Sequence, residues 1–460
     1  MNQNALGAFH DLLGSQIPGL AWPPLPGARH SAVLALLFQM ESSQWLSTAA
    51  LRERQSAQLR TLLAHARRHC RYYRERLPES AATPWAEIPL LTRRDVQSHF
   101  EALLAEAVPA AHGKTFDITT GGSTGEPVTV RRTQLTQLFW EAATLRDHLW
   151  HRRNLSGTMA IVRHFDRPVE TSRSGRWGNG IFRSGPAWYL PISTEIDRQL
   201  DWLQTVNPDI LLTYPTNLSA LMVRMTRQKI GLPRLREVRT ISGTVSEDLR
   251  QRCQAILGLP LIDLYSAQEV GVIGIQCPES GLLHLQSENL LVEVLDAQGR
   301  PCKEGETGQV VVTDLHNVAM PLIRYALRDW AEVGPTCPCG RGLPTLRTVK
   351  GRNRNMAYSP DGNPYWPVLG LSRFRQIIPS LRQYQLVQTG LDAMTVKLVC
   401  DPPPAAEQLQ GLQATLIEAL GYPYRLEWQI HATELPLTAS GKFEEFMSLL
   451  SASGTSKEGQ

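Results

Sequence analysis

The sequence lacks long apolar runs and a strong excess of one charge. No apolar run approaches the ~20 residues that a membrane-spanning helix needs. The N-terminus lacks the charged, apolar and small-residue order of a secretory signal. A net charge of +4 is small for 460 residues, so the composition does not indicate nucleic-acid binding. We therefore expect a cytoplasmic protein with neither a membrane nor a nucleic acid as its partner.

Cysteine is scarce. The chain has seven, and an odd number favours a reduced compartment in which neighbouring thiols bind a metal instead of forming disulfides. There is no internal repeat. The hydrophobic content of 42% over 460 residues is enough for a large core, and this length predicts two or three domains.

Short apolar runs alternate with helical patterns through the middle of the chain, which predicts an α/β fold with a largely parallel sheet. The expected strands are 159–162, 210–214, 237–241 and 261–265, and the expected helices between them are 216–229 and 246–257. Residues 290–333 have the turn-rich pattern of a smaller β-rich subdomain. After residue 352 the pattern changes to that of a small α+β domain.

These changes in pattern predict the domain boundaries. The expected parts are a loosely structured segment over 1–35, a large N-terminal α/β domain over 36–352, a small C-terminal domain over 353–450 and a disordered tail over 451–460. Residues 43–75 have a helical pattern. Thr92 and Asp95 predict a helix start with Thr92 as N-cap, and 134–151 predicts another helix.

A glycine-rich loop follows a predicted strand that ends at Thr119. It runs from Thr120 to Pro127 and contains Gly121, Gly122, Ser123, Thr124 and Gly125. Its unobstructed N–H groups and small hydroxyls suit phosphate oxygens. The loop fits neither G-x-x-x-x-G-K-[ST] nor G-x-G-x-x-G, and a plain hairpin loop explains it equally well.

Polar residues follow the predicted strand that ends at Tyr265, in the segment Asp263–Gly271. Ligands bind at such strand ends. The Tyr265 ring can lie against an aromatic base, and Glu269 is a hard oxygen ligand suited to Mg²⁺. The alternative is a helix start with Ser266 as N-cap and Glu269 at the third position of the helix.

Two further segments carry candidate polar groups. In 320–329, Arg324, Arg328 and Asp329 lie among apolar residues, and the Asp329 carboxylate can accept two hydrogen bonds from a ribose diol. A salt-bridged turn is the alternative. In 435–443, Lys442 follows Ser-Gly, which is otherwise typical of a solvated loop.

Three cysteines and one histidine form a possible zinc set: Cys277, His284, Cys337 and Cys339. Three thiolates and one imidazole complete a tetrahedral Zn²⁺ site. Because no position would remain open, the metal would be structural. The alternative is four unrelated side chains on surface loops.

Taken together and in this order, the segments resemble the adenylate-forming superfamily of acyl- and aryl-CoA ligases, adenylation domains and luciferase. The resemblance implies a phosphate loop at 120–127, adenine contacts from 242–244 and 263–266, and a catalytic lysine at Lys442. It implies Mg²⁺ binding by Glu269 and ribose binding by Asp329, with a domain junction at 351–352. The nucleotide contacts so implied are Thr120, Gly121, Gly122, Ser123, Thr124, Gly125, Ser242, Gly243, Thr244, Asp263, Tyr265, Ser266, Asp329 and Arg352.

Within this superfamily the chain is most similar to the phenylacetate–CoA ligase branch. The similarity lies in Gln44–Leu46, Tyr72–Arg74, Ile88–Thr92, Val311–Leu315 and Met320–Tyr325. Three departures stand out. Glu126 replaces a common Lys in the phosphate loop, Arg354 replaces the usual hinge Asp, and Leu327-Arg328 replaces a common Thr-Gly.

The resemblance implies ATP-dependent activation of a carboxylic acid, and an aryl acid is expected. It also implies that the C-terminal domain then rotates about a hinge at Arg354 and that the acyl group is transferred to CoA. Phe139, Trp140, Tyr214 and Tyr265 are candidate walls of the acid pocket, although ordinary core packing also explains aromatic residues. His164 is a candidate gate. Alternatives are transfer to a carrier-protein pantetheine or an amine, and a nucleotide-binding protein that has lost catalysis. Analogy with relatives suggests a homodimer.

Overall fold

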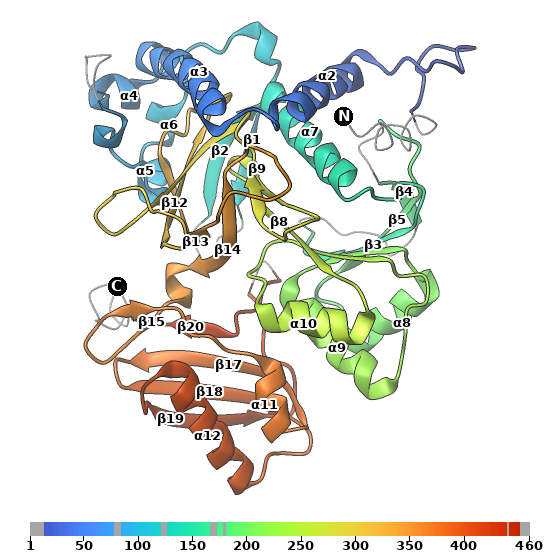
Figure 1. Ribbon diagram of the computed structural model, residues 1–460, viewed down its shortest axis with the longest axis vertical. Coiled ribbons are helices and arrows are strands. Elements are labelled where there is room, and N and C mark those ends of the chain that lie inside the picture. The colour runs from blue at the N-terminus through green and yellow to red at the C-terminus, as the bar shows by residue number, and fades with distance from the viewer. Residues whose placement is uncertain are drawn as a thin grey trace. The chain divides into compact units, whose positions relative to one another are not determined.

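The computed structural model describes residues 13–77, 84–120, 127–165, 173–177, 181–438 and 441–450, and for 173–176 the backbone alone. The chain divides into two compact units. The first unit comprises 1–159, 173–187 and 263–349, and the second comprises 160–172, 188–262 and 350–460. Figure 1 shows the elements of both units in chain order.

The first unit begins with helices. They are α2 (Ala28–Ser43), α3 (Thr48–His69), α4 (Arg71–Arg76), α5 (Arg93–Ser98), α6 (Phe100–Leu103) and α7 (Gln134–Trp150), with 3₁₀ turns at Trp85–Glu87 and Ala110–His112. Helix α2 corrects the prediction that residues 1–35 are all loosely structured, because residues 28–35 are helical. The Pro- and Gly-rich composition stops at Gly27, and the Ala- and Leu-rich sequence after it favours a helix.

The predicted helix over 43–75 is two helices. Cys70 has extended dihedral angles (φ −116°, ψ 119°) and separates α3 from α4. The predicted start at Thr92 is confirmed, since Thr92 and Asp95 form a reciprocal capping box on α5. The helix predicted over 134–151 is confirmed as α7, with a capping box at Thr133.

The first unit holds a two-stranded antiparallel sheet of β1 (Thr115–Thr120) and β2 (Val128–Thr133). Its larger sheet has the strand order β11-β12-β13-β14-β10-β9-β8. In chain order these strands are β8 (Leu261–Ala267), β9 (Gly271–Gln276), β10 (Leu283–Leu285), β11 (Leu290–Leu295), β12 (Thr307–Asp314), β13 (Tyr325–Val333) and β14 (Thr345–Arg352). Pairing is antiparallel from β8 to β10 and from β11 to β13, which confirms the β-rich subdomain.

The second unit contains the parallel part of the fold. Strands β6 (Ile210–Thr213) and β7 (Glu237–Thr240) pair in parallel, and β3 and β5 follow β6 in the strand order. The other elements are β3 (Met159–Arg163), β5 (Pro186–Pro191), α8 (Ile196–Val206), α9 (Pro215–Gln228) and α10 (Glu247–Leu257). Strand β4 (Arg173–Arg176), which precedes β5, belongs to the first unit. The predicted α/β class is thus confirmed, with parallel strands in the second unit and antiparallel strands in the first.

The end of the chain forms a four-stranded sheet with order β19-β18-β17-β20. Its elements are α11 (Leu371–Ile377), β17 (Leu381–Gly390), β18 (Ala393–Cys400), α12 (Ala406–Leu420), β19 (Arg425–His431) and β20 (Phe446–Ser448). They are preceded by a 3₁₀ turn at Asn353–Asn355 and by the hairpin β15 (Ala357–Tyr358) and β16 (Pro364–Tyr365). Phe374, Tyr384 and Leu416 are buried together in its core.

None of the helices within the described part of the chain combines the length and the apolar character needed to cross a bilayer.

Candidate active site

Tyr265 and Asp329 meet in the first unit. Tyr265 lies near the end of β8 and Asp329 lies on β13, and the Tyr265 hydroxyl donates a hydrogen bond of 2.9 Å to Asp329 Oδ2. Tyr265 is buried and Asp329 is half-buried. The structure thus brings together the predicted base-contacting ring and the predicted ribose-binding carboxylate.

Arg324 pairs with a residue on another strand and not within a salt-bridged turn. Its guanidinium pairs with Glu293 at 3.2 Å and donates to the Ile88 carbonyl at 2.6 Å. Arg324 therefore fastens β13 to the segment before α5. Asp329 is the polar residue of this stretch that meets Tyr265.

Glu269 lies in the tight turn between β8 and β9. The predicted alternative, a helix capped by Ser266, is wrong, because Ser266 is a strand residue paired with Val272. The continuous apolar run after Glu269 forms a strand that pairs back on β8, and this pairing outweighs the local capping signal. The register shifts between Tyr265 and Ser266, a bulge of the kind that redirects side chains next to binding sites. Asp263, earlier on β8, is buried, and its backbone N–H donates to Gln276 at 2.7 Å.

Arg93 links Glu269 to the start of the glycine-rich loop. Its Nη1 lies 3.8 Å from Glu269 Oε1, and its Nη2 donates to Thr120 Oγ1 at 3.4 Å. Glu269 is 8% exposed, so this carboxylate is a mostly buried charge with a cation beside it. The sequence analysis missed Arg93, and the one local signal was its place directly after the N-cap Thr92.

The glycine-rich residues Gly121, Gly122, Ser123, Thr124 and Gly125 lie outside the described residues. Their flanks are described, since β1 and β2 form an antiparallel hairpin in which Thr120 faces Val128. Val128 N–H also donates to Thr120 Oγ1 at 3.3 Å. The strand predicted to end at Thr119 therefore ends one residue later and presents Thr120 at the loop entrance.

The aromatic candidates differ in their packing. Phe139 is buried and stacks on His316 with ring centroids 4.2 Å apart. Trp140 is half-buried, and the buried Arg132 guanidinium lies 5.3 Å from its ring centroid. A side chain at Gly271, where φ is +95°, would come within 3.4 Å of Trp140. Trp140 therefore packs against the first residue of β9, whereas Phe139 is packed as a core residue.

In the second unit, Ser242, Gly243 and Thr244 form a turn after β7. Ser242 has φ +64°, an uncommon conformation for a residue other than glycine. A Cβ atom at Gly351, where φ is +114°, would lie 3.1 Å from Thr244 Oγ1. Thus the predicted adenine-contacting turn packs on the Gly351 backbone, next to Arg352.

The predicted junction is joined to the lysine segment. The Arg354 guanidinium forms an ion pair with Glu444, and the Asn355 amide donates to Glu444 Oε2 at 3.1 Å and to the Phe446 carbonyl at 2.9 Å. Arg352 N–H donates to Asn355 Oδ1 at 2.9 Å. Hence this segment is held to the chain that directly follows Lys442.

Lys442 lies on an ordered turn. Its N–H donates to Thr438 Oγ1 at 3.0 Å, and the Thr438 N–H donates to the Lys442 carbonyl at 2.8 Å. Gly441, with φ +72°, packs its backbone against Ile192 and His164. Lys442 is half-buried, which is unlike the freely solvated loop considered from the sequence. The backbone N–H of His164 donates to the hydroxyl of the buried Tyr214 at 3.2 Å.

The predicted zinc ligands lie together. The ligand atoms of Cys277, His284, Cys337 and Cys339 all lie within 4.8 Å of one another. The Cys277 and Cys337 sulfurs are 3.7 Å apart, close to the ~3.8 Å edge of a tetrahedron with Zn–S bonds of ~2.3 Å. These positions rule out four unrelated side chains on separate loops.

The orientation of the His284 ring also fits a metal. His284 Nδ1 lies 3.3 Å from the Leu343 carbonyl, and Nε2 lies 3.3 Å from Cys339 Sγ, on the side of the three thiols. Burial alone would raise the pKa of the Cys277 thiol, but hydrogen bonds from His284 and Ser280 lower it to about 5. A thiolate beside a neutral imidazole is the form that binds zinc.

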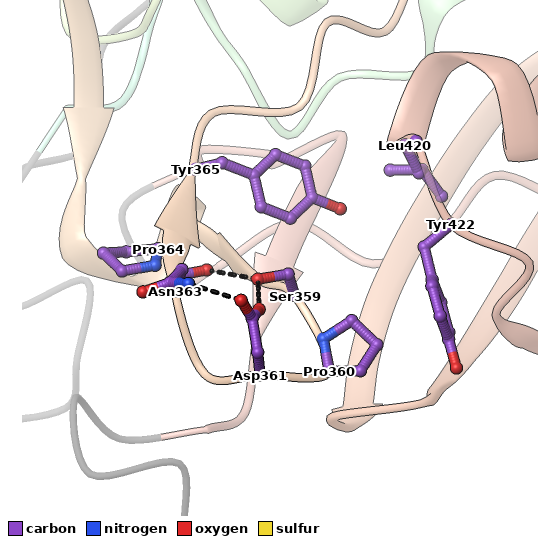
Figure 2. Close-up of a pocket in the computed structure, with 9 residues that line it drawn as sticks. Ser359, Pro360, Asp361, Asn363, Pro364, Tyr365, Leu420 and Tyr422 are labelled. Atoms are coloured by element: carbon purple, nitrogen blue, oxygen red, sulfur yellow. Dashed lines mark hydrogen bonds between the residues drawn. The ribbon is translucent and has the colours of Figure 1, made fainter.

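A separate pocket of about 540 Å³ lies between the β15–β16 hairpin and the end of α12. Figure 2 shows its turn, in which Asp361 accepts hydrogen bonds from Ser359 and Asn363, with the Tyr365 and Tyr422 rings nearby. None of the predicted site residues lines this pocket. We assign it no role in catalysis.

No family model matches the chain. Curated relatives do. The chain is 26% identical over 356 residues to phenylacetate-coenzyme A ligase of Pseudomonas putida, covering 71% of this chain and 75% of that one. It is 23% identical over 389 residues to phenylacetate-coenzyme A ligase of Escherichia coli K12, covering 77% and 84%.

Solved structures share the fold. A 2-hydroxyisobutyryl-CoA ligase in the postadenylation state, in complex with 2-HIB-AMP, has a TM-score of 0.66 at 18% identity, covering 86% of this chain and 90% of that one. The anthranilate CoA ligase AuaEII in complex with anthranoyl-AMP has a TM-score of 0.51 at 17% identity, covering 71% and 65%.

Proposed function

Because this chain belongs to the phenylacetate–CoA ligase-like branch of the adenylate-forming superfamily, we propose that it activates a carboxylic acid with ATP and transfers the acyl group to CoA. The observation that carries the proposal is the Tyr265–Asp329 hydrogen bond, which places a flat aromatic ring beside a carboxylate able to bind a ribose diol. Glu269 lies four residues after Tyr265, on the same hairpin.

The nucleotide is proposed to bind through two sets of residues. In the first unit, Tyr265 stacks on the adenine, Asp329 accepts hydrogen bonds from the ribose, and Thr120 begins the loop that binds the phosphates. In the second unit, the family resemblance assigns nucleotide contacts to Ser242–Thr244 and Arg352. The exposed backbone N–H groups of a glycine-rich loop are suited to this task, because phosphate oxygens need several donors at close range.

The first chemical step joins acid and nucleotide. A carboxylate oxygen of the acid attacks the α-phosphorus of ATP, the bond from that phosphorus to the bridging oxygen breaks, and pyrophosphate leaves. The half-buried Lys442 is proposed to neutralise the negative charge that grows on the phosphate. Loss of such a preorganised charge typically costs on the order of 10²–10³ in rate.

Glu269 fits a magnesium ligand. Its carboxylate is a hard oxygen donor and is mostly buried. Arg93 contacts both this carboxylate and Thr120, at the start of the proposed phosphate loop. Bound Mg²⁺ would supply charge neutralisation for the phosphate oxygens. The Arg93 guanidinium, 3.8 Å from Glu269 Oε1, would orient this carboxylate before the metal binds.

The second step is thioester formation. The thiol of CoA attacks the carbonyl carbon of the acyl-adenylate, and AMP leaves with the electron pair of the broken C–O bond. We propose that a C-terminal domain of about residues 353–450 rotates between the steps and withdraws Lys442. This boundary, with Arg354 at the hinge, rests on the family resemblance.

An aryl acid is the proposed substrate. Trp140 and Tyr265 offer ring faces, and the buried Tyr214 is a further candidate wall. The core packing of Phe139 on His316 makes it the weakest of the four candidates. Planar aromatic acids fit such walls by stacking.

We also propose a structural zinc ion bound by Cys277, His284, Cys337 and Cys339. The ion would join Cys277, directly after β9, and His284, on β10, to the loop after β13 that carries Cys337 and Cys339. With four protein ligands it leaves no open position for a substrate.

The test measures pyrophosphate release with ATP and Mg²⁺ across aryl and aliphatic acids, with and without CoA, for the wild type and Lys442→Ala. Release that depends on one acid, rises with CoA and fails in Lys442→Ala supports the proposal. Pyrophosphate release that does not depend on CoA points to a carrier-protein pantetheine or an amine as acceptor. ATP binding without release for any acid would indicate a protein that has lost catalysis.

A further inference from the structure

A second cavity, of about 470 Å³, is lined by arginines from separate elements of the second unit. Arg227 lies on α9, Arg375 on α11 and Arg382 on β17, and we call this cavity the arginine pocket. Its lining residues are all within the described part of the chain, and Asp401 is the one acid among them. The lining therefore carries an excess of positive charge, in a space of the size that holds small ligands.

The guanidinium of Arg375 is left unpaired. Within the described residues it makes no hydrogen bond or ion pair, and its Nε atom is buried without an acceptor. Arg227, which is exposed, also has no such partner there. Buried N–H donors of a charged group are normally satisfied, because leaving them unpaired costs free energy.

Arg382 is only partly paired. It lies 3.3 Å from Glu434 and donates to the Ala432 carbonyl, but its Nε is also buried without an acceptor. Burial, together with the nearby positive charge of Arg252, lowers the pKa of Arg375. Three arginines therefore line a space in which Asp401 is the one acid, and Glu434 pairs with Arg382 alone among them.

The pocket also has an apolar side. Val223, Leu381 and the prolines of the loop after β18 line it, and Ser380 is tied to that loop by a hydrogen bond of 2.8 Å to the Pro402 carbonyl. A ligand for this site therefore needs a strongly anionic group and a compact organic body.

We propose that the arginine pocket binds a small molecule that carries a phosphate group. Planar guanidinium groups match phosphate oxygens with paired hydrogen bonds, and separate arginines can surround one tetrahedral anion. None of the residues assigned to acid activation lines the pocket, but the pocket lies between α9 and the C-terminal domain that is proposed to rotate, so its shape rests on one arrangement of that domain.

The test is isothermal titration calorimetry of the full chain with glycerol 3-phosphate and with inorganic phosphate, in low-salt buffer. Saturable binding is expected for the wild type, and Arg375→Gln should weaken it about tenfold or more, because hydrogen bonds from a charged donor are lost. Binding to the organic phosphate alone would show that the apolar side contributes. Binding to both probes with equal affinity would assign recognition to the phosphate group.

Two variants separate the pocket from general charge effects. Arg373→Gln, two residues away on α11 in an exposed ion pair with Glu418, should leave affinity unchanged. Asp401→Asn removes the acid of the lining and should tighten binding severalfold. Arg375→Gln without ligand should melt at or above the wild-type temperature, because it removes an uncompensated charge.

The proposal is overturned if glycerol 3-phosphate binds Arg375→Gln and the wild type equally, or if Arg373→Gln weakens binding as much as Arg375→Gln. Tighter binding of acetate or succinate than of either phosphate would replace the phosphate class by a carboxylate. If Arg375→Gln fails to fold, the test rests on Asp401→Asn. An affinity of this variant for glycerol 3-phosphate equal to that of the wild type also overturns the assignment.

Discussion

The Arg93 guanidinium lies between the Glu269 carboxylate, 3.8 Å away, and the Thr120 hydroxyl, to which it donates at 3.4 Å. One side chain thus connects the first turn of α5 with the turn after β8 and with the end of β1. The candidate magnesium ligand and the entrance to the candidate phosphate loop are held at a fixed separation by this arginine.

Replacement of Arg93 by Gln should lower kcat/KM for ATP about tenfold, because a charged hydrogen bond and an ion pair are lost together. The measurement is pyrophosphate release at varied ATP and Mg²⁺, and the concentration of Mg²⁺ at half-maximal rate should change. Arg94→Gln is the matched control, since the neighbouring Arg94 is exposed. Equal kinetics for Arg93→Gln and Arg94→Gln would show that Arg93 has no role in the site.

Tyr265→Phe keeps the ring and deletes the hydroxyl that donates to Asp329. We expect KM for ATP to rise by up to roughly tenfold with a smaller change in kcat, because the ribose-binding carboxylate loses its orienting donor. Tyr73→Phe serves as control. The Tyr73 hydroxyl donates to the Pro321 carbonyl at 2.7 Å in the core, so its loss should lower stability without raising KM. A KM that rises equally in both variants would speak against an orienting role for Tyr265.

The zinc site predicts a metal-dependent stability. Protein purified without chelator should contain about one zinc per chain, and Cys339→Ser should lose the metal and melt several degrees lower. Cys302→Ser is the control, because Cys302 lies outside the cluster of four ligands. Absence of zinc from the wild type, or zinc retained in Cys339→Ser, would contradict the assignment.

Burial raises the pKa of the Glu445 carboxyl, to which the Tyr384 hydroxyl donates at 2.9 Å. A raised folded-state pKa contributes stability that is fully present below the unfolded pKa and is lost as the pH rises through the folded pKa. Asp248 adds to the upward shift and Arg252 opposes it.

Glu445→Gln should therefore be more stable than the wild type at pH 8, by about 1 kcal/mol or more, with the advantage shrinking as the pH falls toward 4. Urea unfolding of both proteins across this range checks it. The exposed Glu418→Gln should show no such trend. A stability difference for Glu445→Gln that is constant with pH would contradict the prediction.

Local signals predicted the structure best where the forces are local. The Thr92–Asp95 capping box was read directly from the sequence because its hydrogen bonds span three residues. The same reasoning failed at Ser266, where cross-strand pairing with Val272 outweighed an equally plausible cap. Arg93 was missed because its partners, Thr120 and Glu269, are distant in sequence.

Residue chemistry predicted the Cys and His cluster, whereas the roles of the aromatic residues depend on their packing in the fold. The cluster of the proposed zinc site was predicted from the donor atoms of its residues, although 60 positions separate Cys277 from Cys337. The aromatic candidates could not be sorted in this way, since stacking on His316 is what distinguishes Phe139 from Trp140, and only the fold reveals it.

The ion pair between Arg354 and Glu444 bears on where the chain can pivot. Arg354 and Asn355 both bind Glu444, so these residues stay with the segment that carries Lys442. A swivel that preserves these contacts has to use backbone torsions that precede Arg354. Gly351, whose φ of +114° lies outside the usual range of other residues, offers such a torsion. For the rotation proposed above, this would place the axis at Gly351–Arg352, upstream of the position inferred from the family.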